Sequence, residues 1–183
     1  IGQLKKAYKM LKSAKKPLIL AGGGVNISHA GEKLKKFMEK ENVPVVTTIM
    51  GKGAVPTTHP LYIGNCGMHG KYAANMAVME CDLLFSIGTR FNDRITGDLN
   101  EFAPHAQIVH IDVDTASISR NVVVDVPVVA DAGVALEKLL EWAEKKDTAK
   151  WQEQIHRWEK ENPLAMRRDR GISPQMIMEH INA

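Results

Sequence analysis

Arginine, glycine and aspartate residues in this sequence occur in patterns that suit a bound nucleotide. Arg90 and Arg94 lie four residues apart, and a guanidinium group matches phosphate oxygens in two-point contacts. Three consecutive glycines at 22–24 let the backbone approach a phosphate and present N–H groups to it. Asp112 is suited to the two hydroxyls of a ribose, which one carboxylate can accept together. These residue types indicate nucleotide binding.

Each of these signals also has a simpler explanation, which the sequence leaves open. The arginines could form surface salt bridges with Asp93 or Asp98. The three glycines could serve only a tight turn between a strand and a helix, and their spacing matches neither GxGxxG nor the phosphate-binding loop GxxxxGK[ST]. We expect Asp114 to cap the turn that follows it.

Other reactive residue types give weaker signals. Cys66 and His69 have half the spacing of a zinc site, but no second pair completes it, so we expect no metal site. The histidines and cysteines show no pairing of a nucleophile with a base, so we expect no catalytic residues. Met50 and Met68 lie in glycine-rich stretches rather than on helix stripes, which favours contact with a flat apolar ligand.

Short apolar runs alternate with helical periodicity along the chain. Five short, largely apolar stretches are predicted to be strands: residues 18–21, 43–47, 83–87, 108–111 and 122–130. Helical spacing marks four others: residues 4–11, 34–38, 72–79 and 135–143. Pro127 indicates a sheet edge, and Asp131 stands where it would cap the last helix. The alternation predicts a doubly wound α/β fold, a mainly parallel sheet of about six strands with helices on both faces, as in Rossmann-like nucleotide-binding domains.

The residues singled out above follow the predicted strands directly. Ligands of open parallel sheets bind beyond the carboxyl ends of the strands. The glycine triplet follows the first predicted strand, and the next three strands run into residues 47–53, 88–94 and 112–114. Because these loops share one edge of the sheet, a crevice of nucleotide size is the leading hypothesis.

The composition is that of one globular domain. The 183 residues are 44% hydrophobic and 25% charged, and 24 basic against 21 acidic side chains leave too small a net charge for a nucleic-acid binder. No apolar run is long enough to span a bilayer, and two cysteines without a CxxC pattern favour a reducing compartment. We therefore expect a cytoplasmic protein that binds neither nucleic acid nor membrane. Because the chain begins with isoleucine, we expect it to be a piece of a longer protein.

The last part of the chain is more polar than the rest. Two tryptophans around Ile155 predict one further helix packed on the domain, and an Asn-Pro pair ends it. Residues 166–171 carry charges with little to bury and predict a linker, after which a Ser-Pro pair starts a new helix. We expect a nucleotide-binding domain over residues 1–162, followed over residues 163–183 by a linker and the start of the next domain.

Taken together, the loops resemble those of one enzyme family. The matching segments run in order over roughly residues 1–180, and they are residues 17–24, 47–53 with Pro56, His59 and Pro60, 67–70, 88–97 and 110–114. They resemble the central domain of the catalytic subunit in the acetolactate synthase (acetohydroxyacid synthase) family of thiamine-diphosphate enzymes. The stretches 50–60 and 90–97 are those that separate this family from its relatives.

The resemblance implies that this domain binds FAD between two thiamine-diphosphate-binding domains of the same chain. It implies that the pyrophosphate is approached by Gly22, Gly23 and Gly24. It implies that the flavin end is lined by Thr48, Ile49, Met50, Gly51, Gly67, Met68, His69 and Gly70. It implies that the ribityl and phosphate region is lined by Gly88, Arg90, Asn92, Arg94 and Ile95, and the adenosine side by Asp112, Val113 and Asp131.

For the whole enzyme, the resemblance implies condensation of two 2-oxoacids, pyruvate with pyruvate or with 2-oxobutyrate, with loss of carbon dioxide, in branched-chain amino-acid biosynthesis. Thiamine diphosphate and Mg²⁺ in other domains would supply the carbon chemistry, and FAD would fill and rigidify one wall of the site. A homo-oligomer and a small regulatory subunit are further implications. This domain alone is expected to be inactive.

Three other interpretations stay open at this stage. The chain could be the middle domain of another thiamine-diphosphate enzyme, such as a 2-oxoacid decarboxylase or oxidase, although residues 90–97 argue against it. An NAD-dependent dehydrogenase or deacylase would require a dinucleotide fingerprint with a catalytic histidine or zinc cysteines, which the sequence does not show. The third interpretation is a non-catalytic nucleotide-binding module.

Overall fold

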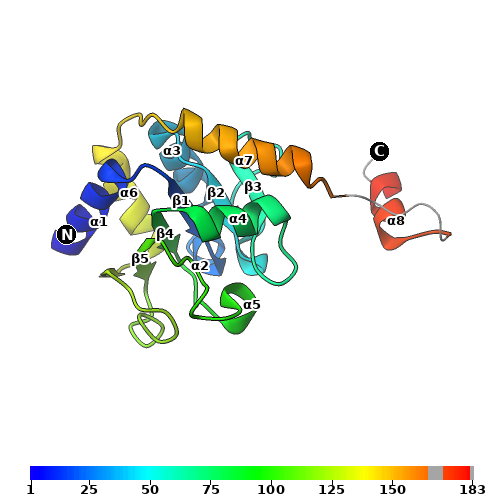
Figure 1. The fold of residues 1–183 in the computed structure, drawn as a ribbon. Coiled ribbons are helices and arrows are strands. Elements are labelled where there is room, and N and C mark those ends of the chain that lie inside the picture. The colour runs from blue at the N-terminus through cyan, green and yellow to red at the C-terminus, as the bar shows by residue number, and fades with distance from the viewer. Residues whose placement is uncertain (165–170, 182–183) are drawn as a thin grey trace.

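One parallel sheet of six strands forms the centre of the structure (Figure 1). The computed structural model describes residues 1–164 and 171–181. The strands are β1 (Pro17–Ala21), β2 (Val45–Thr47), β3 (Tyr62–Asn65), β4 (Leu83–Ile87), β5 (Gln107–Asp112) and β6 (Val126–Val129). They lie in the order β3-β2-β1-β4-β5-β6, and every neighbouring pair is parallel. The predicted doubly wound fold is therefore confirmed, and the strand order reverses between β1 and β4.

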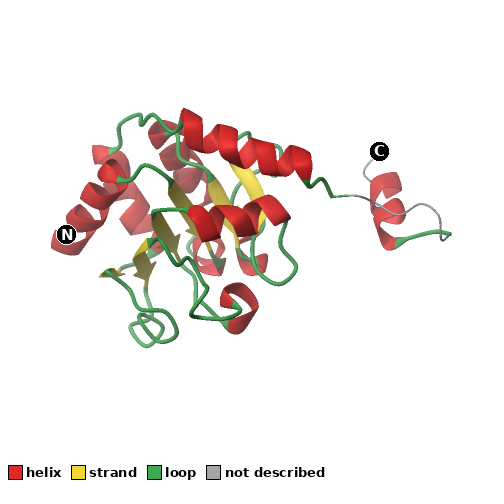
Figure 2. Ribbon diagram, in the orientation of Figure 1, coloured by secondary structure: helices red, strands yellow, loops and turns green. Residues whose placement is uncertain are grey.

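Helices cover both faces of the sheet (Figure 2). The helices are α1 (Gly2–Ser13), α2 (Gly23–Ile27), α3 (Gly31–Glu41), α4 (Tyr72–Glu80), α5 (Asp93–Thr96), α6 (Ala132–Trp142), α7 (Ala149–Glu161) and α8 (Pro174–Ile181), with a 3-10 turn η1 (Ile49–Gly51). Successive residues of a strand point to opposite faces, so Ile19 joins the core under α1, α3 and α6, while Leu18 and Leu20 join the core under α4 and α7. Because all five residues of β1 are buried, this strand reads as a continuous apolar run.

The observed elements differ from the predicted ones at the sheet's edges. Strand β3 has no counterpart among the predicted strands, because only its two central residues are buried and its pairing with β2 shifts register after Val45. Strand β6 is shorter than the predicted 122–130, since Val123 is 88% exposed and lies before the strand begins. Pro127 does lie on an edge strand, as expected, because β6 ends the sheet.

The end of the described chain separates into two parts. Helix α7 buries Trp151 and Ile155 against the sheet face that α4 also covers, which confirms the predicted helix. Helix α8 has no buried residue and stands apart from the sheet in Figure 1. The predicted linker at 166–171 lies outside the described residues except for Gly171. The boundary at residue 162 stays a prediction.

Within residues 1–164 and 171–181, no helix combines the length and the apolar character needed to cross a membrane.

Candidate nucleotide-binding site

The first two loops of the site meet where the strand order reverses. Past the end of β1, the N–H of Gly22 donates to the carbonyl of Ile87 at 2.9 Å, and the N–H of Gly24 donates to the carbonyl of Gly88 at 3.0 Å. A Cβ atom at Gly22 would lie 2.1 Å from that same carbonyl oxygen of Gly88, and one at Gly24 would lie 2.7 Å from its Cα. These two glycines are therefore required by the contact between loops, whatever ligand the loops hold.

The loop after β2 packs against the glycine triplet. Thr48 donates its N–H to the carbonyl of Ala21 at 3.0 Å, and its hydroxyl accepts the N–H of Gly51 at 3.1 Å, which closes the turn η1. Asn26 of α2 binds the carbonyl of Met50 at 2.9 Å and fixes the loop from the other side. The Met50 side chain is left 68% exposed.

The loop after β3 is joined to the loop after β4. The N–H of Met68 donates to the carbonyl of Arg94 at 2.9 Å, and the side-chain amide of Asn75 in α4 bonds both the N–H and the carbonyl of Gly67. A Cβ atom at Gly67 would lie 2.5 Å from the carbonyl oxygen of Arg94, so this contact also requires glycine. The two loops thus form one continuous wall.

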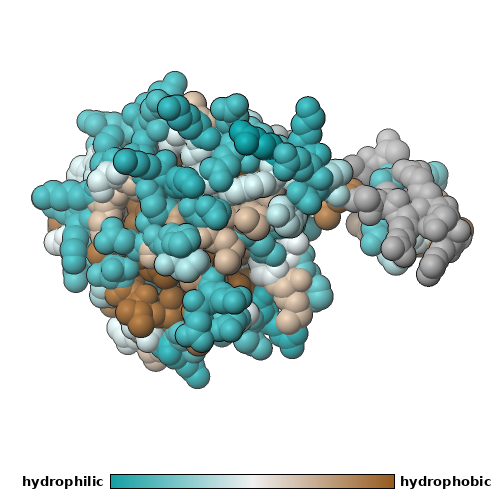
Figure 3. All heavy atoms as spheres, in the orientation of Figure 1, coloured by the Kyte–Doolittle hydropathy of each residue, from teal (hydrophilic) through white to brown (hydrophobic). Residues whose placement is uncertain are grey.

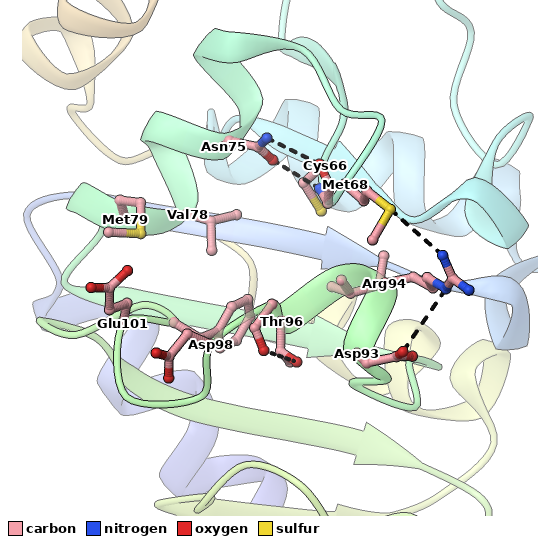
Figure 4. Close-up of a pocket in the computed structure, with 14 residues that line it drawn as sticks. Cys66, Met68, Asn75, Val78, Met79, Asp93, Arg94, Thr96, Asp98 and Glu101 are labelled. Atoms are coloured by element: carbon pink, nitrogen blue, oxygen red, sulfur yellow. Dashed lines mark hydrogen bonds and ion pairs between the residues drawn. The ribbon is translucent and has the colours of Figure 1, made fainter.

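A hollow of about 340 Å³ opens between this wall and helix α4 (Figure 4). Its lining combines apolar side chains, including Met68, Ile95 and Phe102, with a few charged groups. Figure 4 shows the Arg94 guanidinium between the sulfur of Met68, at 3.6 Å, and the carboxylate of Asp93. Its charged groups are one cation, Arg94, and three carboxylates, Asp93, Asp98 and Glu101. The apolar side chains suit a flat ring, and Arg94 is the group that could contact an anion.

The two arginines are exposed and weakly paired. Arg94 Nε lies 3.9 Å from the Asp93 carboxylate, and both side chains are mostly exposed, so this ion pair contributes little. Arg90 is also exposed, and its charge acts at a distance on Asp114. The pKa of the Asp114 carboxyl is lowered mainly by the Ser117 hydroxyl and the Ala116 N–H, with smaller contributions from Arg120 and Arg90. Of the salt bridges considered from the sequence, the structure shows the one between Arg94 and Asp93, and its N–O distance of 3.9 Å is long.

The aspartates at the far end of the site have structural partners. Asp112 is buried at the end of β5, and its Oδ1 accepts the N–H of Asp114 at 2.8 Å, so a ribose hydroxyl would have to use Oδ2. Asp114 in turn accepts the N–H of Ala116, which confirms that it caps its turn. Asp131 accepts two N–H groups at the start of α6, as predicted for a helix cap.

The predicted site residues lie at the carboxyl ends of the strands or in the loops and short helices that follow them, at the bottom of Figure 1. The site extends from the loop after β3 to Asp131 after β6, with the glycine triplet near its middle. Among the described residues, no group of three histidine, cysteine or carboxylate side chains could hold a metal ion. Burial raises the pKa of the Cys66 thiol to about 12, so Cys66 is neutral in the structure.

Several residues that shape the site carry no signal in the sequence. Asn26 and Asn75 tie down two of the loops through their side-chain amides, and His110 is buried beneath a third. Their role depends on which loops come together in three dimensions. Figure 3 shows a hydrophobic area on the surface at the lower left of the molecule. Figure 1 places the segment after β5 in the same region. Val113 and Val123, both exposed, belong to that segment.

Comparisons with known proteins agree with this geometry. A family model described as "Thiamine pyrophosphate enzyme, central domain" matches residues 4–139. The chain is 48% identical over 183 residues to the probable acetolactate synthase large subunit of Methanocaldococcus jannaschii, and the match covers 98% of this chain and 31% of that protein. It is 40% identical to the acetolactate synthase large subunit of Cyanidium caldarium, with 100% and 32% covered. It is 39% identical to the acetolactate synthase isozyme 3 large subunit of Escherichia coli, with 97% and 32% covered. The chain spans about a third of the length of these relatives.

Proposed function

Because the chain belongs to the family of thiamine pyrophosphate enzyme central domains, we propose that it is the FAD-binding central domain of an acetolactate synthase large subunit. One observation carries the FAD part of this proposal. Two exposed arginines stand on a loop that shares a wall with the exposed Met68, beside a hollow that apolar side chains line in part. Guanidinium groups suit a pyrophosphate, and an apolar hollow suits an isoalloxazine ring.

The proposed contacts follow the loops along the sheet edge. Gly23, Arg90, Arg94 and Ile95 serve the ribityl and phosphate region, while Met50 and Met68 face the flavin end. The adenosine end uses Asp112 and Val113. The remaining predicted residues support these contacts through the backbone. Among them are four glycines that pack closely against the backbone of a neighbouring segment: Gly22, Gly24, Gly51 and Gly67.

The longer protein, we infer, condenses two 2-oxoacids, pyruvate with pyruvate or with 2-oxobutyrate, and releases carbon dioxide. Thiamine diphosphate with Mg²⁺, bound by other domains, would supply the carbanion chemistry. The residues of this chain would orient FAD and exclude water from one side of the site, and none of them forms or breaks a bond. The domain alone is therefore inactive in this proposal. The names of the relatives favour this reaction over that of a 2-oxoacid decarboxylase or oxidase.

The proposal includes partners and a location. Neighbouring thiamine-diphosphate-binding domains would cover the exposed loops, and the intact enzyme would form a homo-oligomer with a small regulatory subunit. The words "large subunit" in the relatives' names support the last point. A cytoplasmic location is part of the proposal and is consistent with two free, buried thiols.

An FAD titration tests the proposal directly. We expect the protein to quench flavin fluorescence saturably, and Arg90→Ala and Arg94→Ala each to weaken FAD by about one to two decades, as loss of a charged hydrogen-bond partner typically does. Arg157→Ala is the matched control, because Arg157 is an exposed arginine on α7, away from the loops. The melting temperature should stay the same in all three variants. Absence of saturable quenching by the unmodified protein, or an equal loss in Arg157→Ala, would contradict FAD binding at this edge.

A further inference from the structure

The loop that carries Arg90 has a backbone conformation that needs support. Phe91 has φ = 44°, in the left-handed region that residues with a side chain rarely adopt. Its side chain is buried, with 2% exposed. Such a conformation persists where surrounding contacts hold it in place. The source of that support lies beneath the loop.

His110 contacts the residues on both sides of Arg90. It is fully buried on β5, and its Nε2 lies 2.7 Å from the carbonyl oxygen of Thr89. That oxygen can only accept, so Nε2 carries the proton and donates. The imidazole ring also meets the Phe91 ring edge to face, with centroids 4.8 Å apart and an angle of 74° between the planes. One side chain thus holds both neighbours of Arg90.

Further contacts complete the support of this loop. Ser86, the register partner of His110 on β4, shares a hydrogen bond of 2.5 Å with the Thr89 hydroxyl. Asn121 donates to the carbonyl of Phe91 at 3.0 Å, and Phe102 meets the Phe91 ring edge to face. The side chain of Arg90 itself points out of this framework and is exposed.

We propose that His110 is a positioning residue, which fixes the strained loop at Thr89 and Phe91 so that Arg90 is presented to the phosphates of the bound nucleotide. This rests on the proposed function, because the phosphates belong to the proposed FAD. His110 touches no ligand in this proposal and acts through the backbone.

The cost of a buried histidine supports this role. The Nδ1 atom of His110 is one of two buried side-chain nitrogen or oxygen atoms that have no hydrogen-bond partner among the described residues. A buried polar atom without a partner is unfavourable, and an apolar side chain would avoid that cost. A leucine or valine, however, could neither donate to Thr89 nor place an aromatic ring against Phe91. The donor and the ring are the two features that the loop uses.

Three substitutions separate these two features. His110→Gln places an amide N–H at the position of Nε2 and keeps the bond to Thr89. His110→Asn places its amide at the position of Nδ1 and loses that bond, at a similar polarity. His110→Phe keeps a ring and loses the donor. If His110→Phe does not fold, the comparison of Gln with Asn still decides the question.

Two measurements should be made on each variant. The first is the rate of hydrogen exchange at the amides of Ile95, Thr96 and Gly97, which donate to the carbonyls of Asn92 and Asp93 just after Phe91. The amides of helix α6, elsewhere in the fold, serve as the reference. The second is the dissociation constant for FAD. Exchange of the loop reports on its order without any ligand.

We expect His110→Phe to speed exchange at residues 95–97 about tenfold, with α6 unchanged, and to weaken FAD about tenfold, since it loses one hydrogen bond to a backbone carbonyl. His110→Asn should have at least this effect, because it loses the same hydrogen bond and also the ring contact with Phe91. His110→Gln should stay within about threefold of the unmodified protein in both measurements. Equal behaviour of Gln and Asn, or equal acceleration in the loop and α6, would overturn the positioning role. Failure of the unmodified protein to bind FAD would instead overturn the proposed function, and the exchange data would still test His110.

Discussion

Asp112 has one task that the structure shows and one that we propose. Its Oδ1 accepts the backbone N–H of Asp114 and so fixes the turn after β5. Its Oδ2, which lies 3.8 Å from Nε2 of His110, is the oxygen that we propose for a ribose hydroxyl. An asparagine keeps a carbonyl oxygen for the turn but removes the negative charge. An alanine removes both. The two substitutions therefore separate the structural task from the binding task.

We expect Asp112→Asn to leave the melting temperature nearly unchanged and to weaken FAD by about one decade, because a neutral acceptor bonds a hydroxyl less strongly than a carboxylate does. Binding of FMN, which lacks the adenosine half, should hardly change in this variant. Asp112→Ala should in addition lower the melting temperature. Fluorescence titrations with both flavins and thermal unfolding check this, and equal losses for FAD and FMN in Asp112→Asn would remove Asp112 from the ribose site.

The protonation of His110 links the same region to pH. Burial lowers the pKa of His110 from its usual value near 6.5, and this outweighs the Thr89 carbonyl and the Asp112 carboxylate, which raise it. The unfolded chain therefore binds a proton at a higher pH than the folded chain does. The stability that the neutral histidine contributes is complete above about pH 6.5 and decreases as the pH falls below that value.

We expect the free energy of unfolding of the unmodified protein to decrease between pH 7 and pH 5 by more than that of His110→Gln, which has no titrating group at this position. Urea unfolding of both proteins across this range measures the difference, and the other titrating groups cancel in the comparison. Parallel pH dependence of the two proteins would show that His110 is not held neutral by the fold.

At the scale of elements, the glycines act as contacts between loops. The loops after β1 and β4 touch through backbone atoms, and so do the loop after β2 and the end of β1. Such close approach leaves no room for side chains, which makes each loop depend on its neighbour for position. The candidate site is therefore built from pairs of loops rather than from separate ones.

Gly22→Ala tests this dependence. The new Cβ would lie 2.1 Å from the carbonyl oxygen of Gly88, which belongs to the backbone and cannot rotate away. We expect a loss of about 3 kcal/mol or more in the free energy of unfolding. Gly2→Ala is the matched control, since a Cβ at Gly2 meets no atom within 4 Å, and it should be neutral or slightly stabilising. Comparable losses in both variants would mean that the loops do not pack as described.

At the scale of the whole molecule, helix α7 packs into the core of the sheet domain, whereas helix α8 does not. Trp151 of α7 is 2% exposed and donates its indole N–H to the carbonyl of Pro17 at the start of β1. Helix α8 buries no residue, and its Ile177, Met178 and Ile181 side chains are exposed. These exposed apolar residues agree with the proposal that α8 packs against a following domain.

Truncation after residue 162 should therefore leave the melting temperature unchanged, whereas truncation after residue 148 should cost several kcal/mol, because it removes Trp151 and Ile155 from the core. Thermal unfolding of the two truncated proteins beside the full chain checks this. A large loss of stability on removal of residues 163–183 alone would place the domain boundary further along the chain.

The sequence by itself determined the fold class and which loops gather at one edge of the sheet, where the candidate site lies. The run 18–21 is apolar throughout, and 83–87 is apolar except for Ser86, which is the pattern of parallel strands covered on both faces. Glycines and arginines follow these two runs directly. The capping roles of Asp114 and Asp131 were also predictable, because a cap acts within a few residues of its own position. Local physics was enough for these features.

Only the tertiary structure decided which loops support one another. Strand β3 escaped prediction because its partly polar residues are placed by pairing with β2, and the apolar pattern of 122–130 extended beyond β6 because Val123 lies outside the sheet. In the sequence, His110 is a single polar residue within a predicted strand. In the structure it bonds the carbonyl of Thr89 and packs against the ring of Phe91, both 19 or more residues away in the chain. Contacts between segments distant in sequence have no local signature, since they depend on strand order and register, which form only when the chain has folded.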